Sequence, residues 1–127
     1  GMPAADFLFT TQAGEKGWLY QLQSRYILLF FHDPDCEECQ YVKKQLENQH
    51  AHFAQKGVLV VAVYIDDEVE VWRKAHYPSA WLSVYAPEID KQDLYDIKAL
   101  PTLYLLDTQK RVILKDAQID KVVSYYE

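Results

Sequence analysis

Two short, continuous apolar runs stand out from the hydrophobic and polar pattern of the chain. The first covers residues 26–31 and is closed by Asp33 and Pro34, and the second covers residues 58–65 and is closed by Asp66 and Asp67. Runs of this length, rich in aromatic and β-branched residues, are typical of strands buried on both faces. About 26 residues separate them, enough for a crossover helix, so we expect the two strands to pair in parallel.

The segment between the two runs has helical periodicity. Its apolar side chains recur at three to four residues and again two turns later, at Cys39, Val42, Leu46 and Phe53. Asp35 is a favourable N-cap, and Glu38 follows three residues later in a carboxylate variant of the capping box. This places Cys36 at the first helical position. Gly57 is well placed to end the helix in a left-handed cap, so we expect one helix over residues 36–57.

The second half of the chain predicts shorter elements. We expect helices over residues 68–74, 91–97 and 118–126, and strands over residues 102–106 and 111–115 joined as an antiparallel hairpin. An aromatic-rich segment starts within the first of these helices, and its side chains either bind a partner or pack as a small core: Trp72, Tyr77, Trp81 and Tyr85. The order of elements predicts an α/β sandwich with a mixed central sheet.

Length, charge and cysteine count limit what such a protein can do. The 127 residues fit a single domain over residues 1–127. A net charge of −6 is the wrong sign for neutralising phosphates, so we expect no nucleic-acid partner. Two cysteines allow at most one internal disulfide and exclude a metal site built from four thiolates of one chain.

The longest apolar run and the N-terminus bear on localisation. The run over residues 58–65 is far shorter than the roughly 20 residues of a membrane-spanning helix, so no transmembrane segment is expected. The N-terminus lacks the features of a signal peptide, and Gly1 ahead of Met2 is typical of a scar left by tag cleavage. We therefore expect a piece of a longer protein from which any export signal or preceding domain has been removed.

Both cysteines fall in one motif, Cys36-Glu37-Glu38-Cys39, directly after the first buried strand. On a helix this spacing puts the two side chains on one face with Cβ atoms about 5–6 Å apart, so a small adjustment allows a disulfide. The unpaired amides and the helix dipole stabilise a thiolate in the first turn. Cys36, nearer the loop, is the predicted nucleophile, and Cys39, on the apolar face, is the predicted resolving thiol.

Three other interpretations of the motif remain open. The cysteines could be small buried hydrophobic residues, or they could form a structural disulfide whose short loop contributes little stability. They could also be half of a zinc site completed by two histidines, although the usual ligand spacing is missing among His32, His50, His52 and His76. The position of the motif at a helix start favours redox chemistry without a metal.

Together these features resemble the thioredoxin superfamily. A strand, a CxxC motif at a helix start, a second strand, and Leu100-Pro101-Thr102 leading into a hairpin follow one another over residues 19–126. The stretch between Asp66 and Pro101 is longer than in a plain thioredoxin by an extra helix and strand. This insertion is similar to that of extracytoplasmic thiol–disulfide oxidoreductases of the TlpA and ResA type. Residues 30–36 and 95–107 resemble thioredoxin-like domains of exported Bacteroidetes proteins.

The resemblance implies a thioredoxin fold, a central mixed β-sheet flanked by helices, with the insertion before a cis-proline. It implies thiol–disulfide exchange at a redox-active Cys36–Cys39 disulfide, with no other cofactor. Pro101 matches the cis-proline that lies against this disulfide, and Leu100 matches the residue whose backbone pairs with the substrate chain. The implied partners are protein thiols and disulfides and an upstream redox partner. The implied location is extracytoplasmic, either periplasmic or anchored as a lipoprotein.

The chain departs from the thioredoxin pattern close to the motif. Phe30 stands where thioredoxin has a buried Asp and Val63 where it has a Lys, so the usual proton-handling pair is missing. Four carboxylates crowd the motif instead: Asp33, Asp35, Glu37 and Glu38. Their charge disfavours a Cys36 thiolate while the helix dipole favours it, and if repulsion prevails the pair is a reductant. The excess of acid beside the site also predicts discrimination against acidic partner surfaces. Alternatively, the carboxylates only cap the helix.

Further hypotheses concern a histidine and the activity as a whole. His32 could accept a proton or hold an imidazolium beside the thiolate, or it could be structural. The domain could instead be a non-catalytic binding module whose CxxC is a redox-sensitive latch or captures a soft metal. A peroxidase of the peroxiredoxin kind has little support, because residues 31–35 contain no Thr.

Overall fold

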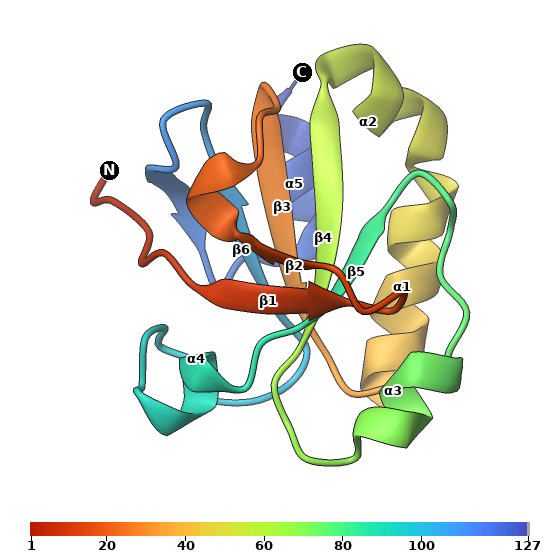
Figure 1. The fold of residues 1–127 in the computed structure, drawn as a ribbon. Helices are drawn as coiled ribbons and strands as arrows, with labels where there is room; N and C mark the ends of the chain where they lie inside the picture. Colours follow the sequence, from red (N-terminus) through yellow and green to blue (C-terminus); the bar gives the residue numbers. More distant parts are fainter. Residues whose placement is uncertain (127) are drawn as a thin grey trace.

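A seven-stranded sheet runs through the molecule in the order β2-β1-β5-β4-β3-β6-β7 (Figure 1). The computed structural model describes residues 1–126, and Glu127, the last residue of the predicted domain, lies outside them. The strands are β1 (Leu8–Thr11), β2 (Lys16–Trp18), β3 (Tyr26–Phe31), β4 (Val58–Tyr64), β5 (Leu82–Tyr85), β6 (Thr102–Leu106) and β7 (Val112–Lys115). Because β3, β4 and β5 are parallel and the other pairings are antiparallel, the predicted mixed sheet is confirmed.

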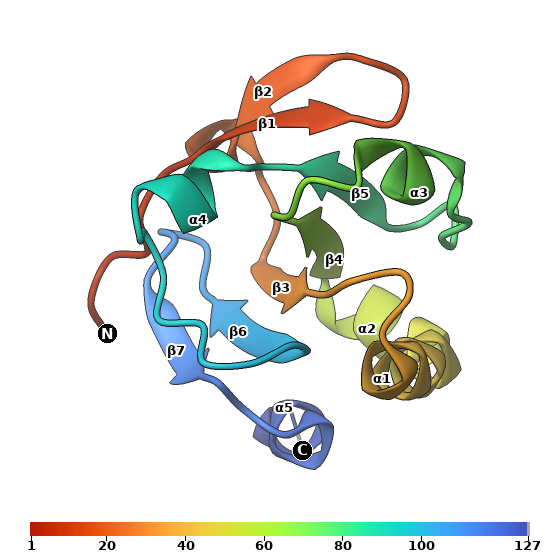
Figure 2. The same cartoon turned by 90° about the horizontal axis from the view of Figure 1, so that it is seen from below.

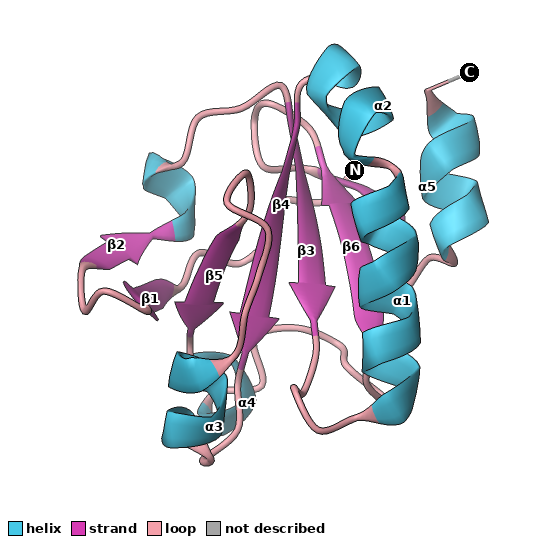
Figure 3. Ribbon diagram, turned by 90° about the vertical axis from the view of Figure 1, so that its right-hand side faces the viewer, coloured by secondary structure: helices cyan, strands magenta, loops and turns pink. Residues whose placement is uncertain are grey.

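The two apolar runs form the centre of the sheet. β3 and β4 pair in parallel, with Tyr26 opposite Val58 and Phe31 opposite Val63, as the sequence predicts. Figure 3 shows α1 (Glu37–Asn48), α2 (His50–Lys56) and α5 (Ile119–Tyr125) on one face of the sheet. Figure 2 shows α4 (Glu88–Lys91) on the opposite side. Both faces of β3 are therefore covered, which explains why its residues are continuously apolar.

The helix expected over residues 36–57 is two helices. α1 ends at Asn48 and α2 begins at His50, with Gln49 between them at φ −95° and ψ 12°. Across this break, Leu46 of α1 and Phe53 of α2 both reach the apolar cluster on the same face of the sheet. Gly57 ends α2 with a φ of 74°, so the predicted left-handed cap is confirmed.

The insertion and the C-terminal part contain one wrong prediction. The expected helix of the insertion is α3 (Val69–Lys74), its strand is β5, and the β6–β7 hairpin and α5 are confirmed. No helix covers residues 91–97. The helical turn α4 lies upstream, and Asp93, at φ 51°, follows it. Tyr95 is buried edge-on against the rings of Phe7 and Tyr104, so core packing sets the path of this segment.

An N-terminal hairpin, absent from the sequence prediction, extends the sheet. β1 pairs with β2 on one side and with β5 on the other, and a 3-10 helix, η1 (Leu19–Gln21), follows β2. The strands have only four and three residues, too few for a periodic signal. Gly17 lies opposite Phe9, whose ring would come within 2.8 Å of a Cβ atom at that position. A glycine is therefore required for this close packing.

Candidate active site at the CxxC motif

The two cysteines lie where β3 passes into α1. Cys36 is the N-cap of α1, not its first helical residue, because its Sγ accepts a hydrogen bond from the Cys39 amide at 3.1 Å. Asp35, the predicted N-cap, belongs to the preceding turn, where its amide donates to the Asp33 carboxylate at 2.9 Å. The Cys36 sulfur thus takes the part that a side-chain oxygen usually plays at a helix start.

The two thiols have different surroundings. Both are free; Cys36 is half-buried, whereas Cys39 is only 1% exposed. Cys39 Sγ accepts a hydrogen bond from the Asp33 amide at 3.5 Å. Burial, and after it the hydrogen bond with Cys36, raises the pKa of Cys39 to about 12. Cys39 is therefore a thiol at neutral pH, and Cys36 is the sulfur that a partner can reach.

Leu100 and Pro101 lie beside Cys36. The Leu100–Pro101 peptide bond is cis, the conformation that the resemblance implied. The Leu100 carbonyl oxygen is 4.0 Å from Cys36 Sγ. β6 begins directly afterwards at Thr102, which pairs with Phe31 at the end of β3. The antiparallel pairing of β3 and β6 therefore brings the two distant segments to the same edge of the sheet.

The carboxylates around the motif differ in exposure. Asp35, Glu37 and Glu38 are exposed, whereas Asp33 is half-buried. Glu37 and Glu38 line a surface depression of about 550 Å³ together with Tyr41, which is 64% exposed. An acidic surface with one open aromatic ring thus adjoins Cys36.

His32 does not fit the imidazolium hypothesis. It is buried and stacks on Phe30, with ring centroids 4.8 Å apart. Nδ1 lies 3.2 Å from the Phe30 carbonyl oxygen and Nε2 lies 2.6 Å from the Tyr77 hydroxyl. Since a carbonyl only accepts, Nδ1 donates to it and Nε2 accepts from Tyr77. Burial lowers the pKa of His32 to about 4, so the ring is neutral at neutral pH.

The aromatic residues of the insertion pack inward onto the main core. Trp72 is buried and its Nε1 donates to Ser83 Oγ at 2.9 Å. Trp81 lies edge-on to Phe30 with ring centroids 6.2 Å apart. With Tyr77 bonded to His32, this segment supports the strand end that carries the CxxC motif. Sequence reasoning missed this link because nothing local connects residues 45 positions apart.

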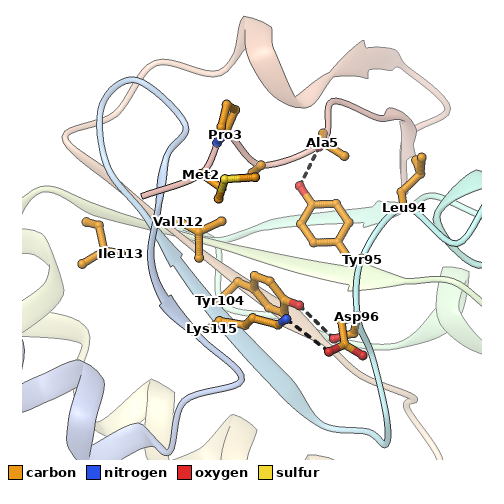
Figure 4. A pocket seen from close by; sticks show the side chains of 11 residues that line it. Met2, Pro3, Ala5, Leu94, Tyr95, Asp96, Tyr104, Val112, Ile113 and Lys115 are labelled. Carbon is orange, nitrogen blue, oxygen red and sulfur yellow. Dashed lines mark hydrogen bonds and ion pairs between the residues drawn. The ribbon is translucent and has the colours of Figure 1, made fainter.

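A separate hollow of about 380 Å³ lies between the N-terminal segment, the loop after α4, and β6 and β7 (Figure 4). Its polar side chains bond to the protein itself. Lys115 Nζ lies 3.2 Å from Asp96 Oδ2, and the Tyr104 hydroxyl donates to the Asp96 carbonyl at 2.8 Å. The Tyr95 hydroxyl donates to the Ala5 carbonyl at 2.6 Å. Neither cysteine lines this hollow, so it is not part of the candidate active site.

Two kinds of feature are absent from the described chain. Within residues 1–126, no group of three or more His, Cys, Asp or Glu side chains is arranged to hold a metal ion. The same residues contain no helix with the length and apolar character needed to cross a membrane.

Comparison with known protein families shows which family the chain belongs to. A family model described as thioredoxin-like matches residues 24–112, most of the chain from before β3 to β7. The chain belongs to the thioredoxin-like family. Its relatives include thiol–disulfide oxidoreductase ResA of Bacillus subtilis strain 168, which is 28% identical over 116 residues. That alignment covers 89% of this chain and 64% of ResA, so the chain spans less than two thirds of this relative.

Solved structures agree with this assignment. The C-terminal domain of an uncharacterized protein from Bacteroides fragilis NCTC 9343 is 38% identical, with a TM-score of 0.93 over 98% of this chain and 94% of that one. A thioredoxin-like protein from Bacteroides caccae ATCC 43185 is 36% identical, with a TM-score of 0.92 over 98% of this chain and 48% of that one. The thioredoxin-like fold and the resemblance seen in the sequence are therefore confirmed, and the family includes proteins named thiol–disulfide oxidoreductases.

Proposed function

We propose that this protein reduces or exchanges disulfides in protein substrates through Cys36 and Cys39. The observation that carries the proposal is the position of Cys36 Sγ. It is half-buried at a helix N-cap, 3.1 Å from the Cys39 amide and 4.0 Å from the Leu100 carbonyl oxygen. An amide donor and the helix start stabilise the anionic sulfur that attacks a partner disulfide.

The proposed reaction has two exchange steps. First, the Cys36 thiolate attacks a partner disulfide: the bond between Cys36 and one partner sulfur forms, the partner disulfide breaks, and the released sulfur takes up a proton. Cys39 then attacks Cys36 Sγ, the Cys36–Cys39 disulfide forms, and the second partner sulfur leaves and is protonated. The partner gains two electrons and the cysteine pair loses two. The redox-active cysteine pair is the only redox group required.

Leu100 and Pro101 are proposed to position the partner. An extended partner segment that pairs with the backbone at Leu100 presents its sulfur to Cys36, because the Leu100 carbonyl adjoins that sulfur. The proposed partners are protein thiols and disulfides and an upstream redox protein. An extracytoplasmic location, where disulfides form and persist, suits this activity.

Replacement of each cysteine tests the mechanism. In an insulin-reduction assay with dithiothreitol, we expect the wild type to accelerate reduction and Cys36→Ser to abolish the acceleration, because no attacking thiolate remains. Cys39→Ser is expected to lose turnover but to accumulate a mixed disulfide on Cys36, which mass spectrometry detects. The same trap, used in the native cell, identifies the partner.

The control is the double replacement Cys36→Ser with Cys39→Ser, which should form no mixed disulfide and should be folded by circular dichroism. If the wild type reduces insulin no faster than dithiothreitol alone, the proposal fails. The alternative would then hold, namely a binding module whose CxxC is a redox-sensitive latch or captures a metal.

A further inference from the structure

The resolving step of the proposed reaction needs a proton acceptor close to Cys39. Cys39 is buried and its pKa lies at about 12, so its sulfur carries a proton at neutral pH, whereas only a thiolate attacks a disulfide. Phe30 and Val63 occupy the two strand positions where a proton-handling pair is expected, and both are fully buried and apolar. Neither of these side chains can take the proton.

His32, at the end of β3, cannot be that group. Its Nδ1 donates to the Phe30 carbonyl and its Nε2 accepts from the Tyr77 hydroxyl, so neither nitrogen has a free lone pair. Its pKa of about 4 agrees, because burial disfavours the cation that would form.

The other titratable groups around this edge are also unsuited. Burial raises the pKa of Tyr64, on β4, and of Tyr77, in the insertion, so both hydroxyls keep their protons. Lys43, on α1, is a cation whose Nζ donates to the His76 carbonyl and lies 4.7 Å from the Tyr77 ring centroid. The carboxylates of Asp35, Glu37 and Glu38 are exposed, and none of the hydrogen bonds described for Cys39 involves them.

Asp33 is held between the two cysteines. Its amide donates to Cys39 Sγ at 3.5 Å, and its carbonyl accepts from the Cys36 amide at 3.1 Å. Its side chain is half-buried, and the turn with Asp35 uses one carboxylate oxygen. Besides the larger effect of burial, the negative charge of Asp33 raises the pKa of Cys39 and also acts on His32, Tyr64 and Tyr77. The backbone of Asp33 therefore contacts both cysteines, which places its side chain at the turn that carries the motif.

We propose that the Asp33 carboxylate accepts the proton of Cys39 during resolution of the mixed disulfide, an inference that rests on the proposed function. Transfer within the pair leaves its total charge unchanged, whereas loss of the proton to water would place two negative charges side by side. The Cys39 thiolate then attacks Cys36 Sγ, the Cys36–Cys39 bond forms, and the bond to the partner breaks. The departing partner sulfur takes the proton back from Asp33. Asp33, in the loop that follows β3, thus performs the proton transfer for which the strand itself has no acidic residue.

A neutral chromogenic disulfide separates the two steps. When the reduced protein is mixed with less than one equivalent of 4,4′-dithiodipyridine, attack by Cys36 releases one thiopyridone and resolution by Cys39 releases the second. We expect Asp33→Asn to leave the first phase within about twofold of the wild type and to slow the second at least about tenfold at neutral pH, as for loss of a general base. The slow phase should recover with rising pH, as hydroxide replaces the carboxylate.

Asparagine is chosen because its side-chain oxygen can still accept the Asp35 amide and keep the turn. The matched control is Glu47→Gln, which removes an exposed carboxylate at the far end of α1 and should change neither phase more than about twofold. Asp33→Glu, which restores a carboxylate, should recover part of the second-phase rate. Near-ultraviolet circular dichroism compares the packing of all variants.

The outcomes separate the inference from the proposed function. An unchanged second phase in Asp33→Asn, or equal slowing of both phases, overturns the role of Asp33 while the two-step reaction stands. Absence of any Cys36-dependent release in the wild type means that the proposed function itself fails. Selective slowing of the second phase, with recovery at high pH and in Asp33→Glu, supports Asp33 as the proton acceptor.

Discussion

Cys36 and His32 lie four residues apart, yet the turn between them gives the side chains opposite surroundings. His32 continues the alternation of β3: it faces the same side of the sheet as Phe30, stacks on that ring and is buried. Cys36 comes after the turn formed by Asp33 and Asp35 and stays half-buried at the N-cap. His32 is therefore placed as a neutral ring that supports the end of β3, whereas Cys36 is placed as a sulfur that a partner can contact.

Burial of neutral His32 predicts a pH-dependent stability. Its pKa falls from an ordinary 6.5 to about 4 in the folded protein, so between these values the unfolded chain binds a proton that the folded chain does not. The contribution of neutral His32 to the free energy of unfolding is complete above pH 6.5. It falls by about 3 kcal/mol in total as the pH is lowered to 4. Urea unfolding across this range measures it.

The variant His32→Gln isolates this contribution, because the glutamine oxygen can accept from the Tyr77 hydroxyl but the side chain does not titrate. We expect the wild type to lose about 3 kcal/mol more than the variant between about pH 7.5 and pH 4. Parallel stability curves for the two proteins would contradict the assignment of a depressed pKa to His32.

At the scale of elements, the connection from β3 to β4 depends on two helices and one glycine. α1 sets the cysteines at its start, the break at Gln49 redirects the chain, and α2 returns it to β4. Gly57 makes this return with a φ of 74°, and its amide donates to the Ala54 carbonyl. Arg25, just before β3, packs against the same point. The cap therefore couples the starts of the two central strands.

Replacement of Gly57 by alanine should destabilise the fold through both the backbone and the contact. A left-handed conformation costs an L-residue about 1–2 kcal/mol, and the new Cβ atom would lie 3.0 Å from Arg25 Cβ. Gly14→Ala is the matched control, because Gly14 has a φ of 89° but no atom within 4 Å of the new Cβ. Chemical denaturation should show the larger loss for Gly57→Ala; equal losses would mean that the Arg25 contact contributes nothing.

On the scale of the whole molecule, the negative charge of the protein affects which partner disulfides react fastest in the proposed exchange. The chain carries a net charge of −6, and the exposed carboxylates of Asp35, Glu37 and Glu38 adjoin the reachable sulfur. A field of one sign around a reactive group changes the encounter rate with charged partners and is screened by salt. The protein is therefore expected to discriminate among disulfides by the charge that flanks them.

Peptide disulfides of opposite flanking charge test this discrimination. We expect faster reduction of a lysine-flanked than of a glutamate-flanked peptide, by roughly tenfold at low ionic strength, with the ratio falling as salt is added. Glu37→Gln with Glu38→Gln should lower the ratio severalfold. The control, Glu15→Gln with Glu47→Gln, removes two exposed charges away from Cys36 and should leave the ratio nearly unchanged. A ratio that is insensitive to salt would contradict an electrostatic cause.

The fold was largely predictable because its strongest signals are local. The apolar runs of β3 and β4, the CxxC spacing and Gly57 each fix a structure within a few residues. The secondary-structure predictions were wrong or incomplete where contacts between distant parts of the chain determine the conformation. Residues 91–97 carry a helix-like pattern, but Tyr95 is held in the core against Phe7. β1 and β2 become strands through pairing with each other and with β5, which their short sequences do not indicate.

The sequence by itself determined the central strands, the position of both cysteines at a helix start, and the family to which the chain belongs. It did so because apolar periodicity, helix caps and motif spacing act over short stretches of chain. Only the tertiary structure decided that Leu100 adjoins Cys36, that Tyr77 bonds His32, and that Asp33 contacts Cys39. The first two contacts join residues far apart in the chain, and the third depends on the fold of the turn before α1. These side chains therefore become buried and come close to one another only when the sheet and its helices are packed.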